Sequence, residues 1–208
     1  MIIISHRGYW YEESEKNTEI AFRRSFQHNF GTETDVRDCL GELVISHDLP
    51  SGTELPFHSF LSLVDSEQPL LAINIKANGL ADLLHGAMKG YNPYNWFVFD
   101  MSVPDMRAHL KAGNPVFARM SEVEQQPAWF NLIQGVWLDN FEDEWYDLQL
   151  IKDLIQKGKR VCVVSSELHN QDNSLLWCKL RPLANVDQLI LCTDTPELAK
   201  EYFKDPAK

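Results

Sequence analysis

Residues 2–8 read Ile-Ile-Ile-Ser-His-Arg-Gly, a short apolar run that ends in side chains suited to chemistry. A continuous apolar run of this length, bounded by polar residues, is typical of a strand that is buried on both faces of a parallel sheet. The same pattern recurs along the chain. We expect eight strands, at 2–5, 31–36, 70–76, 96–100, 115–119, 135–139, 160–165 and 189–193.

Amphipathic stretches separate these runs and predict helices. They lie at 18–29, 59–66, 79–89, 103–112, 121–131, 143–157, 171–181 and 195–203. Ser121 and Glu124 have the spacing of a capping box at a helix start. Gly113 and Gly158 stand where a left-handed residue ends a helix.

Eight strands that alternate with helices predict a closed (β/α)8 barrel, the TIM barrel. The 208 residues lie near the lower limit for that fold, so we expect a compact single domain over 1–208 with short loops. The alternative is an open doubly wound sheet. No glycine-rich phosphate loop follows the first strand, which favours the barrel.

The charge balance restricts the partners. Lys and Arg total 19 against 30 Asp and Glu, a formal net charge of −11. Nucleic acids and anionic membranes are bound by clustered positive charge, so we expect neither as a partner. No apolar run is long enough for an integral membrane segment. Cys162 and Cys192 lie in apolar strands and are expected to be buried free thiols, which indicates a cytoplasmic location.

Glu33 and Asp35 are one residue apart on the second expected strand. Side chains alternate along a strand, so both carboxylates point to the same face. They can be ordinary charges on an exposed strand, but in a buried run unpaired carboxylates are costly. Oxygen ligands suit hard cations, so the pair predicts a site for one divalent cation, Mg²⁺ or Ca²⁺.

Two histidines follow apolar runs, His6 after 2–4 and His47 after 43–45. They are candidates for the general acid and the general base, and the alternative is a pair of structural histidines. Arg7 and Lys76 are candidate phosphate ligands, Arg through its bidentate fork and Lys as a point charge, unless they only pair with the site carboxylates.

Other polar and aromatic residues are weaker candidates. Asn17 either caps the first helix or also fixes the site. The aromatic run 9–11 (Tyr-Trp-Tyr) falls on the first loop, where one or two rings are placed to stack on an alcohol or sugar headgroup. Arg119, Asp139 and His169 are candidates for substrate contact, although a strand-end Asp or Arg is often a cap or an ion-pair partner.

Read together, these residues resemble the glycerophosphodiester phosphodiesterase family, whose members are TIM barrels like the phosphatidylinositol phosphodiesterases. The resemblance rests on short motifs in order. They are His6-Arg7-Gly8, Lys16-Asn17-Thr18, Ala21-Phe22, Glu33-Thr34-Asp35-Val36, the run Leu43 to His47-Asp48, Asn74-Ile75-Lys76 and Cys192-Thr193-Asp194-Thr195-Pro196. The resemblance spans nearly the whole chain.

The resemblance implies a divalent metal held by Glu33, Asp35 and the residue at 74, which is a glutamate in the family and Asn74 here. An amide oxygen can still coordinate a hard cation, but it adds no charge. Asp100 and Asp139 are the alternatives for the missing carboxylate. Only residues 48–75 separate His47 from Lys76, so the subdomain that the family inserts after the second strand is short or missing.

We therefore expect a metal-dependent phosphodiester hydrolase that acts on a glycerophosphodiester or a similar small phosphodiester, with His6 and His47 as acid and base. The nucleophile is water or a hydroxyl group of the substrate. One alternative is a lyase-type phospholipase that releases a cyclic phosphate. The other is a catalytically impaired barrel that binds a phosphorylated ligand, which the neutral Asn74 keeps open.

Overall fold

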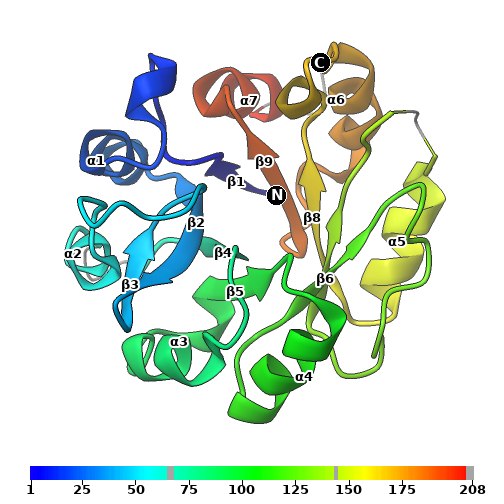
Figure 1. The fold of residues 1–208 in the computed structure, drawn as a ribbon. Coiled ribbons are helices and arrows are strands. Elements are labelled where there is room, and N and C mark those ends of the chain that lie inside the picture. Colours follow the sequence, from blue (N-terminus) through cyan, green and yellow to red (C-terminus); the bar gives the residue numbers. More distant parts are fainter. Residues whose placement is uncertain (65–67, 143–144, 205–208) are drawn as a thin grey trace. The chain divides into compact units, whose positions relative to one another are not determined.

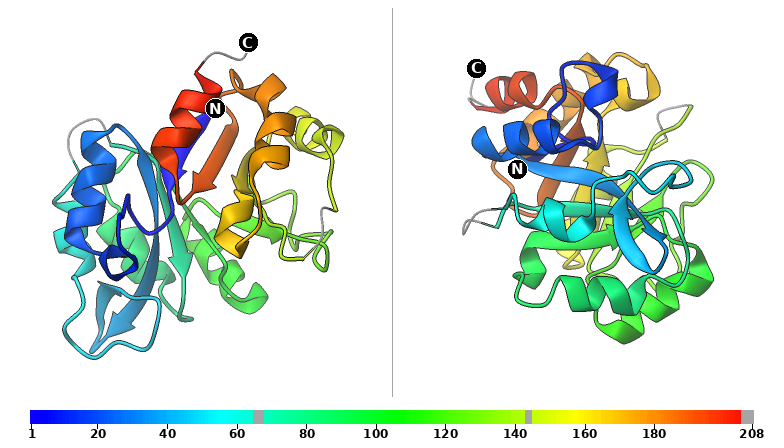
Figure 2. Two further views of the ribbon diagram at one scale, coloured as in Figure 1. Left: turned by 90° about the horizontal axis from the view of Figure 1, so that it is seen from above. Right: turned by 60° about the vertical axis from the view of Figure 1, so that its left-hand side comes forward.

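The computed structural model describes residues 1–64, 68–142 and 145–204. The chain forms two compact units. One consists of His6–Val116, and the other of Met1–Ser5 together with Phe117–Lys208. Figures 1 and 2 show the helices and strands of both units.

The unit His6–Val116 is built on four strands, β2 (Gly31–Cys39), β3 (Glu42–Ile45), β4 (Leu71–Ile75) and β5 (Trp96–Phe99). β4 pairs in parallel with β2 on one side and with β5 on the other, and β3 pairs antiparallel with β2. In the β2–β4 register Asp35 lies opposite Asn74. This register brings polar residues of two strands to the same end of the sheet.

Helices accompany these strands, with α1 before β2 and the others after β3, β4 and β5 (Figure 1). They are α1 (Glu19–Gln27), α2 (Phe57–Leu61), α3 (Ala81–Ala87) and α4 (Val103–Ala112), with short 3-10 turns η1 (Glu13–Glu15) and η2 (Pro93–Asn95). α1 and α2 pack through Phe22 and Phe60, whose ring centroids are 4.6 Å apart. α4 ends at Gly113, which has a φ of 83° as the predicted cap requires.

The other unit holds five parallel strands in the order β1-β9-β8-β7-β6. Their bounds are β1 Ile2–Ser5, β6 Phe117–Met120, β7 Gly135–Leu138, β8 Arg160–Val164 and β9 Leu189–Thr193. The helices are α5 (Leu148–Gln156), α6 (Ser174–Leu180) and α7 (Pro196–Phe203), with the turns η3 (Ser166–His169) and η4 (Arg181–Leu183). Cys162 and Cys192 are buried and neither is in a disulfide, as predicted.

All eight predicted strands are confirmed within a few residues. β3 is an additional strand that the sequence did not predict. The helix expected at 121–131 is wrong, because that segment forms turns. The amide of Glu124 donates to the carbonyl of Ser121 (3.1 Å), which closes a single turn. Pro127 then lacks an amide donor and disfavours a helical conformation of the residue before it.

Two predicted helices overlap segments that the structure leaves undescribed. Residues 65–66 of the helix expected at 59–66 and residues 143–144 of the helix expected at 143–157 lie outside the described residues. The described parts form the short α2 and, from Leu148 onward, α5. In the part of the chain that the structure describes, no helix has the length and apolar character needed to cross a bilayer.

Candidate active site

The site in the unit His6–Val116 begins with the turn at residues 6–8. Arg7 and Gly8 both have positive φ, 55° and 86°. The amide of Arg7 donates to Glu33 Oε2 (3.1 Å), and the amide of Gly8 donates to Thr32 Oγ1 (3.0 Å). A Cβ atom at position 8 would lie 2.6 Å from Cβ of Ala21. Only glycine therefore fits here, and the turn is fixed against β2 and α1.

Asp35 is fully buried at the centre of the site. Arg7 Nε lies 3.0 Å from Oδ2, and Lys76 Nζ lies 3.3 Å from Oδ1. The side-chain amide of Asn17 donates to Oδ2 (2.8 Å), while its own oxygen accepts from the hydroxyl of Thr34 (2.9 Å). Asn17 therefore holds the carboxylate, which supports its predicted contact with the site, whereas the predicted capping is wrong because the N-cap of α1 is Thr18.

Glu33 is 1% exposed and lies on the same face of β2 as Asp35. Its Oε2 atom is 3.9 Å from His6 Nε2. Burial, together with the negative charge of Asp35, raises the pKa of Glu33 to about 7, and the nearby His6, Arg7 and Lys76 only partly oppose this rise. A cation bound next to Glu33 would stabilise the charged form of this buried carboxyl group.

Asn74 lies across from Asp35 on β4 and is 7% exposed. Its Nδ2 atom contacts Asp100 Oδ2 at 3.4 Å. Its Oδ1 atom is buried and has no hydrogen-bond partner among the described residues. A buried acceptor without a partner is uncommon, and a cation would satisfy it. Glu33, Asp35 and Asn74 thus offer an all-oxygen donor set that fits Mg²⁺ or Ca²⁺.

Asp100 is the carboxylate that the structure places beside this donor set. It directly follows β5 and has a positive φ of 64°. Among residues 1–64, 68–142 and 145–204, no group of three or more His, Cys, Asp or Glu side chains is arranged to hold a metal. An amide ligand such as Asn74 is therefore needed to complete the proposed set.

His47 lies at the rim of the same unit. The amide of Ser46 donates to the carbonyl oxygen of Asp35 (3.0 Å), so the backbone at His47 runs beside β2. Nδ1 of His47 contacts Asp48 Oδ1 at 2.9 Å, and the histidine side chain is 45% exposed. The structure therefore brings His6, Glu33, Asp35, Asn74, Arg7 and Lys76 together, while the ring of His47 is exposed and contacts Asp48.

The weaker candidates Arg119, Asp139 and His169 belong to the other unit. Asp139 follows β7 and is 6% exposed, and its Oδ1 atom lies 2.7 Å from His169 Nε2. This hydrogen bond raises the pKa of His169. Phe141 and the same imidazole pack in an edge-type geometry, with ring centroids 5.0 Å apart, and Arg119 Cζ lies 5.5 Å from the centroid of Phe141. Asp139 is thus committed to His169 within its own unit.

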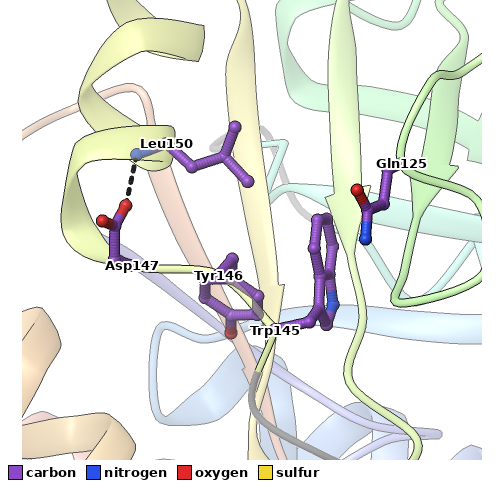
Figure 3. Close-up of a pocket in the computed structure, with 5 residues that line it drawn as sticks. All are labelled: Gln125, Trp145, Tyr146, Asp147 and Leu150. Atoms are coloured by element: carbon purple, nitrogen blue, oxygen red, sulfur yellow. Dashed lines mark hydrogen bonds between the residues drawn. The ribbon is translucent and has the colours of Figure 1, made fainter.

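A cavity of about 460 Å³ opens in this second unit (Figure 3). Its lining residues are Gln125, Trp145, Tyr146, Asp147 and Leu150. The indole of Trp145 donates to the carbonyl oxygen of Asp139 (2.8 Å), and Asp147 accepts from the amide of Leu150 (3.0 Å) as the cap of α5. Among the lining residues, no predicted catalytic residue appears and the only carboxylate is used as a cap, so this cavity is a poor candidate for catalysis.

Comparisons with known proteins bear on the fold. No family model matches the sequence, and no curated protein matches it. Solved structures do match over the whole chain. A glycerophosphodiester phosphodiesterase from Parabacteroides distasonis has a TM-score of 0.68 at 17% identity, covering 100% of this chain and 98% of that one.

Two further structures are similar. The glycerophosphodiester phosphodiesterase from Agrobacterium tumefaciens has a TM-score of 0.72 at 16% identity, covering 98% of this chain and 99% of that one. The Oleispira antarctica phosphodiesterase, solved with its product sn-glycerol-3-phosphate, has a TM-score of 0.68 at 15% identity, covering 98% and 97%. The fold is that of the glycerophosphodiester phosphodiesterases.

The predicted (β/α)8 barrel is confirmed by this likeness and by the eight parallel strands, which alternate with helices except between β6 and β7. The connection after the second strand is short, as predicted. Between β2 and β4, the described residues form only the hairpin strand β3 and the five-residue α2.

Within this phosphodiesterase fold, some residues that support the site were not predicted from the sequence. Thr32 and Thr34 point to the opposite face of β2 from the carboxylates, where they hold Gly8 and Asn17. The sequence held a usable signal for these roles. Thr32 and Thr34 alternate with the carboxylates in a buried strand, where hydroxyl groups need hydrogen-bond partners. Asp48 stood in a quoted motif, but only the structure shows that its carboxylate faces His47.

Proposed function

We propose that this chain is a metal-dependent phosphodiester hydrolase that acts on a glycerophosphodiester or a similar small phosphodiester. The observation that carries the proposal is the pair of buried carboxylates, Glu33 and Asp35, which lie with Arg7 and Lys76 at one end of the sheet. Barrel enzymes have their active sites at the carboxyl ends of the strands. The product found in the Oleispira antarctica phosphodiesterase supports a small phosphate-bearing substrate.

Glu33, Asp35 and Asn74 would hold one divalent cation, Mg²⁺ or Ca²⁺. When bound, the ion supplies Lewis acidity that polarises the phosphoryl oxygens and offsets developing negative charge. Arg7 and Lys76 bind the remaining phosphate oxygens and orient the diester. Both cations contact Asp35, so they are held in place before the substrate arrives.

His6 and His47 carry the proton transfers. Asp48 lies 2.9 Å from Nδ1 of His47, which favours the tautomer with the proton on Nδ1 and leaves Nε2 to take a proton. His47 then acts as the base that deprotonates the attacking water or substrate hydroxyl. The attacking oxygen forms a bond to phosphorus, the bond to the leaving alcohol breaks, and His6 gives that alkoxide its proton.

One observation favours a second function. Arg7 and Lys76 already neutralise Asp35 without a metal, and Asn74 adds no charge. A barrel in this state would bind a phosphorylated ligand through the two cations without cleaving it. Metal dependence distinguishes the two functions, because only the hydrolase needs the divalent ion.

The test is hydrolysis of bis(p-nitrophenyl) phosphate and a panel of glycerophosphodiesters with Mg²⁺, Ca²⁺ or a chelator. We expect turnover that requires the metal, falls by roughly 100-fold or more in His6→Ala, and persists in His58→Ala, which removes an exposed histidine of α2. Binding of glycerol 3-phosphate without turnover under any metal condition would instead support the binding function.

Phosphorus NMR of the products separates hydrolysis from the lyase reaction. A phosphomonoester as the first product supports water as the nucleophile, and an accumulating cyclic phosphate would show that a substrate hydroxyl attacks. The single domain over 1–208 and the cytoplasmic location stay predictions.

A further inference from the structure

Two hydrogen bonds hold the segment between β1 and α1 against the turn of the candidate active site. The indole of Trp10 donates to the carbonyl oxygen of His6 (3.1 Å), and the amide of Asn17 donates to the carbonyl oxygen of Arg7 (2.9 Å). Trp10, which makes the first of these hydrogen bonds, and Lys16, which precedes Asn17, therefore lie beside the residues proposed to act on the phosphate.

Cations cover one face of two aromatic rings in this segment. Lys16 Nζ lies 4.4 Å from the centroid of Trp10, and Arg24 Cζ lies 3.9 Å from the centroid of Tyr11. Aromatic faces of this kind recognise quaternary ammonium groups when they are open. Here the protein's own cations occupy them, so a cationic headgroup such as choline would meet both a filled face and a like charge.

Lys16 is held less firmly than Arg24. Arg24 donates to the carbonyl oxygen of Tyr9 and to Glu15, and these bonds fix its guanidinium group. Lys16 contacts Glu13 at 3.2 Å, but the side chain of Glu13 is 85% exposed. Exposed pairs contribute little free energy, so an anion of the substrate can replace Glu13 as the partner of Lys16.

We infer that Lys16, supported by Trp10, forms a subsite for a negatively charged group on the substrate's alcohol. The inference rests on the proposed phosphodiesterase function and narrows its substrate class to diesters that carry a second anionic group, a carboxylate or a phosphate. The reacting phosphate occupies Arg7 and Lys76, and the second anion occupies Lys16. Diesters with an uncharged alcohol are poorer substrates, and diesters with a cationic alcohol are the poorest.

The experiment compares three diesters that differ mainly in the charge of the alcohol. They are glycerophosphoglycerol phosphate, glycerophosphoglycerol and glycerophosphocholine. We expect kcat/KM to fall in that order, by roughly tenfold between the diester with the anionic alcohol and the diester with the uncharged alcohol, the size of one charge-assisted hydrogen bond. The difference should lie mostly in KM, because Lys16 binds a part of the substrate that does not react.

Variants test whether Lys16 causes the preference for the diester with an anionic alcohol. Lys16→Gln should abolish the preference for the anionic diester, and Lys16→Glu should reverse it in favour of glycerophosphocholine. Glu13→Gln should strengthen the preference by removing the competing carboxylate. Lys89→Glu makes the same change of net charge at an exposed position after α3 and should leave the order unchanged. An unchanged order in Lys16→Glu would overturn the inference.

Binding measurements test the Lys16 subsite independently of the proposed catalysis. If wild-type protein hydrolyses no diester, the proposed function fails, but calorimetric binding of the same three compounds to wild type and Lys16→Glu still decides the subsite. Tighter binding of the anionic compound that is lost in Lys16→Glu supports the subsite. Equal affinities for all three compounds refute it.

Discussion

Glu33 shows how a single buried carboxyl group links stability to function. Its pKa is about 7 in the folded protein, against an ordinary value of 4.5. Between these values the folded state binds more protons than the unfolded state. The free energy of unfolding of the metal-free protein therefore decreases as pH rises through this range, and the loss is complete above pH 7.

Glu33→Gln should accordingly stabilise the metal-free protein at pH 8, on the order of 2 kcal/mol. The gain should vanish near pH 4, where the carboxyl group is protonated in both states. Urea unfolding at both pH values in the presence of a chelator measures the difference. The same variant should lose divalent-cation binding in calorimetry, because the amide brings no negative charge to the site.

Glu12→Gln is the matched control for this prediction, since it removes an exposed carboxylate. It should change neither metal affinity nor the pH dependence of unfolding. A Glu33→Gln protein that is less stable than wild type at pH 8 would contradict the conclusion that burial and Asp35 disfavour the charged form of Glu33.

Gly8 supports a second prediction at this scale. Gly8→Ala introduces a methyl group 2.6 Å from Cβ of Ala21 at a φ of 86°, so it should cost at least about 2 kcal/mol of stability. Gly41 has nearly the same φ, 88°, with nothing within 4 Å of its added Cβ. Gly41→Ala therefore measures the backbone strain alone, and urea unfolding of both variants isolates the clash. Equal losses would show that the turn can move away from α1.

The sequence could place several site residues in space, because strand alternation puts Glu33 and Asp35 on one face without any knowledge of the fold. It could not show that both Arg7 and Lys76 contact Asp35, since this depends on side-chain conformation and on the turn at Gly8. For the same reason it could not show the exposure of the His47 ring. The catalytic and metal-binding roles of these residues stay predictions.

At the scale of elements, the register of β2 and β4 fixes the third oxygen ligand. Asn74 lies opposite Asp35, with its buried Oδ1 lacking a hydrogen-bond partner among the described residues. Asn74→Asp should raise the affinity for Mg²⁺ or Ca²⁺ by roughly tenfold or more, because it adds a third carboxylate to the same donor set. Isothermal calorimetry measures the change.

A second variant at the same position tests whether the side chain of Asn74 is a metal ligand. Asn74→Leu keeps a similar volume but has no donor atom, so it should lose metal affinity. An Asn74→Asp protein that binds the ion no better than wild type would indicate that position 74 is not a ligand, and Asp100 would then be the residue to test.

The elements that the sequence missed have local physical causes. β3 has only four residues and directly follows a tight turn at Gly41, so its apolar run was too short to predict a separate strand. The segment 121–131 has an apparent helix start at Ser121, but Pro127 and the left-handed Trp129, with a φ of 49°, cannot continue a helix. The barrel was still predictable, because eight buried strands specify it even when one helix is absent.

At the scale of the whole molecule, metal binding should be readable in unfolding. An ion that binds only the folded state adds about 2.7 kcal/mol when its concentration is 100 times Kd. For a chain of this size that corresponds to a rise in Tm of roughly 5–10 °C. Differential scanning calorimetry with Mg²⁺, Ca²⁺ or a chelator measures the shift, and Glu33→Gln should abolish it.

The shape of the same transition tests the prediction of one domain over 1–208. Glu33, Asp35 and Asn74 all belong to the unit His6–Val116. If the chain unfolds as one cooperative domain, the ion raises a single transition whose calorimetric and van't Hoff enthalpies agree. If the two units unfold separately, the ion raises only the transition of the unit that contains the site. A second transition that does not respond to metal would therefore refute the single domain while leaving the metal site intact.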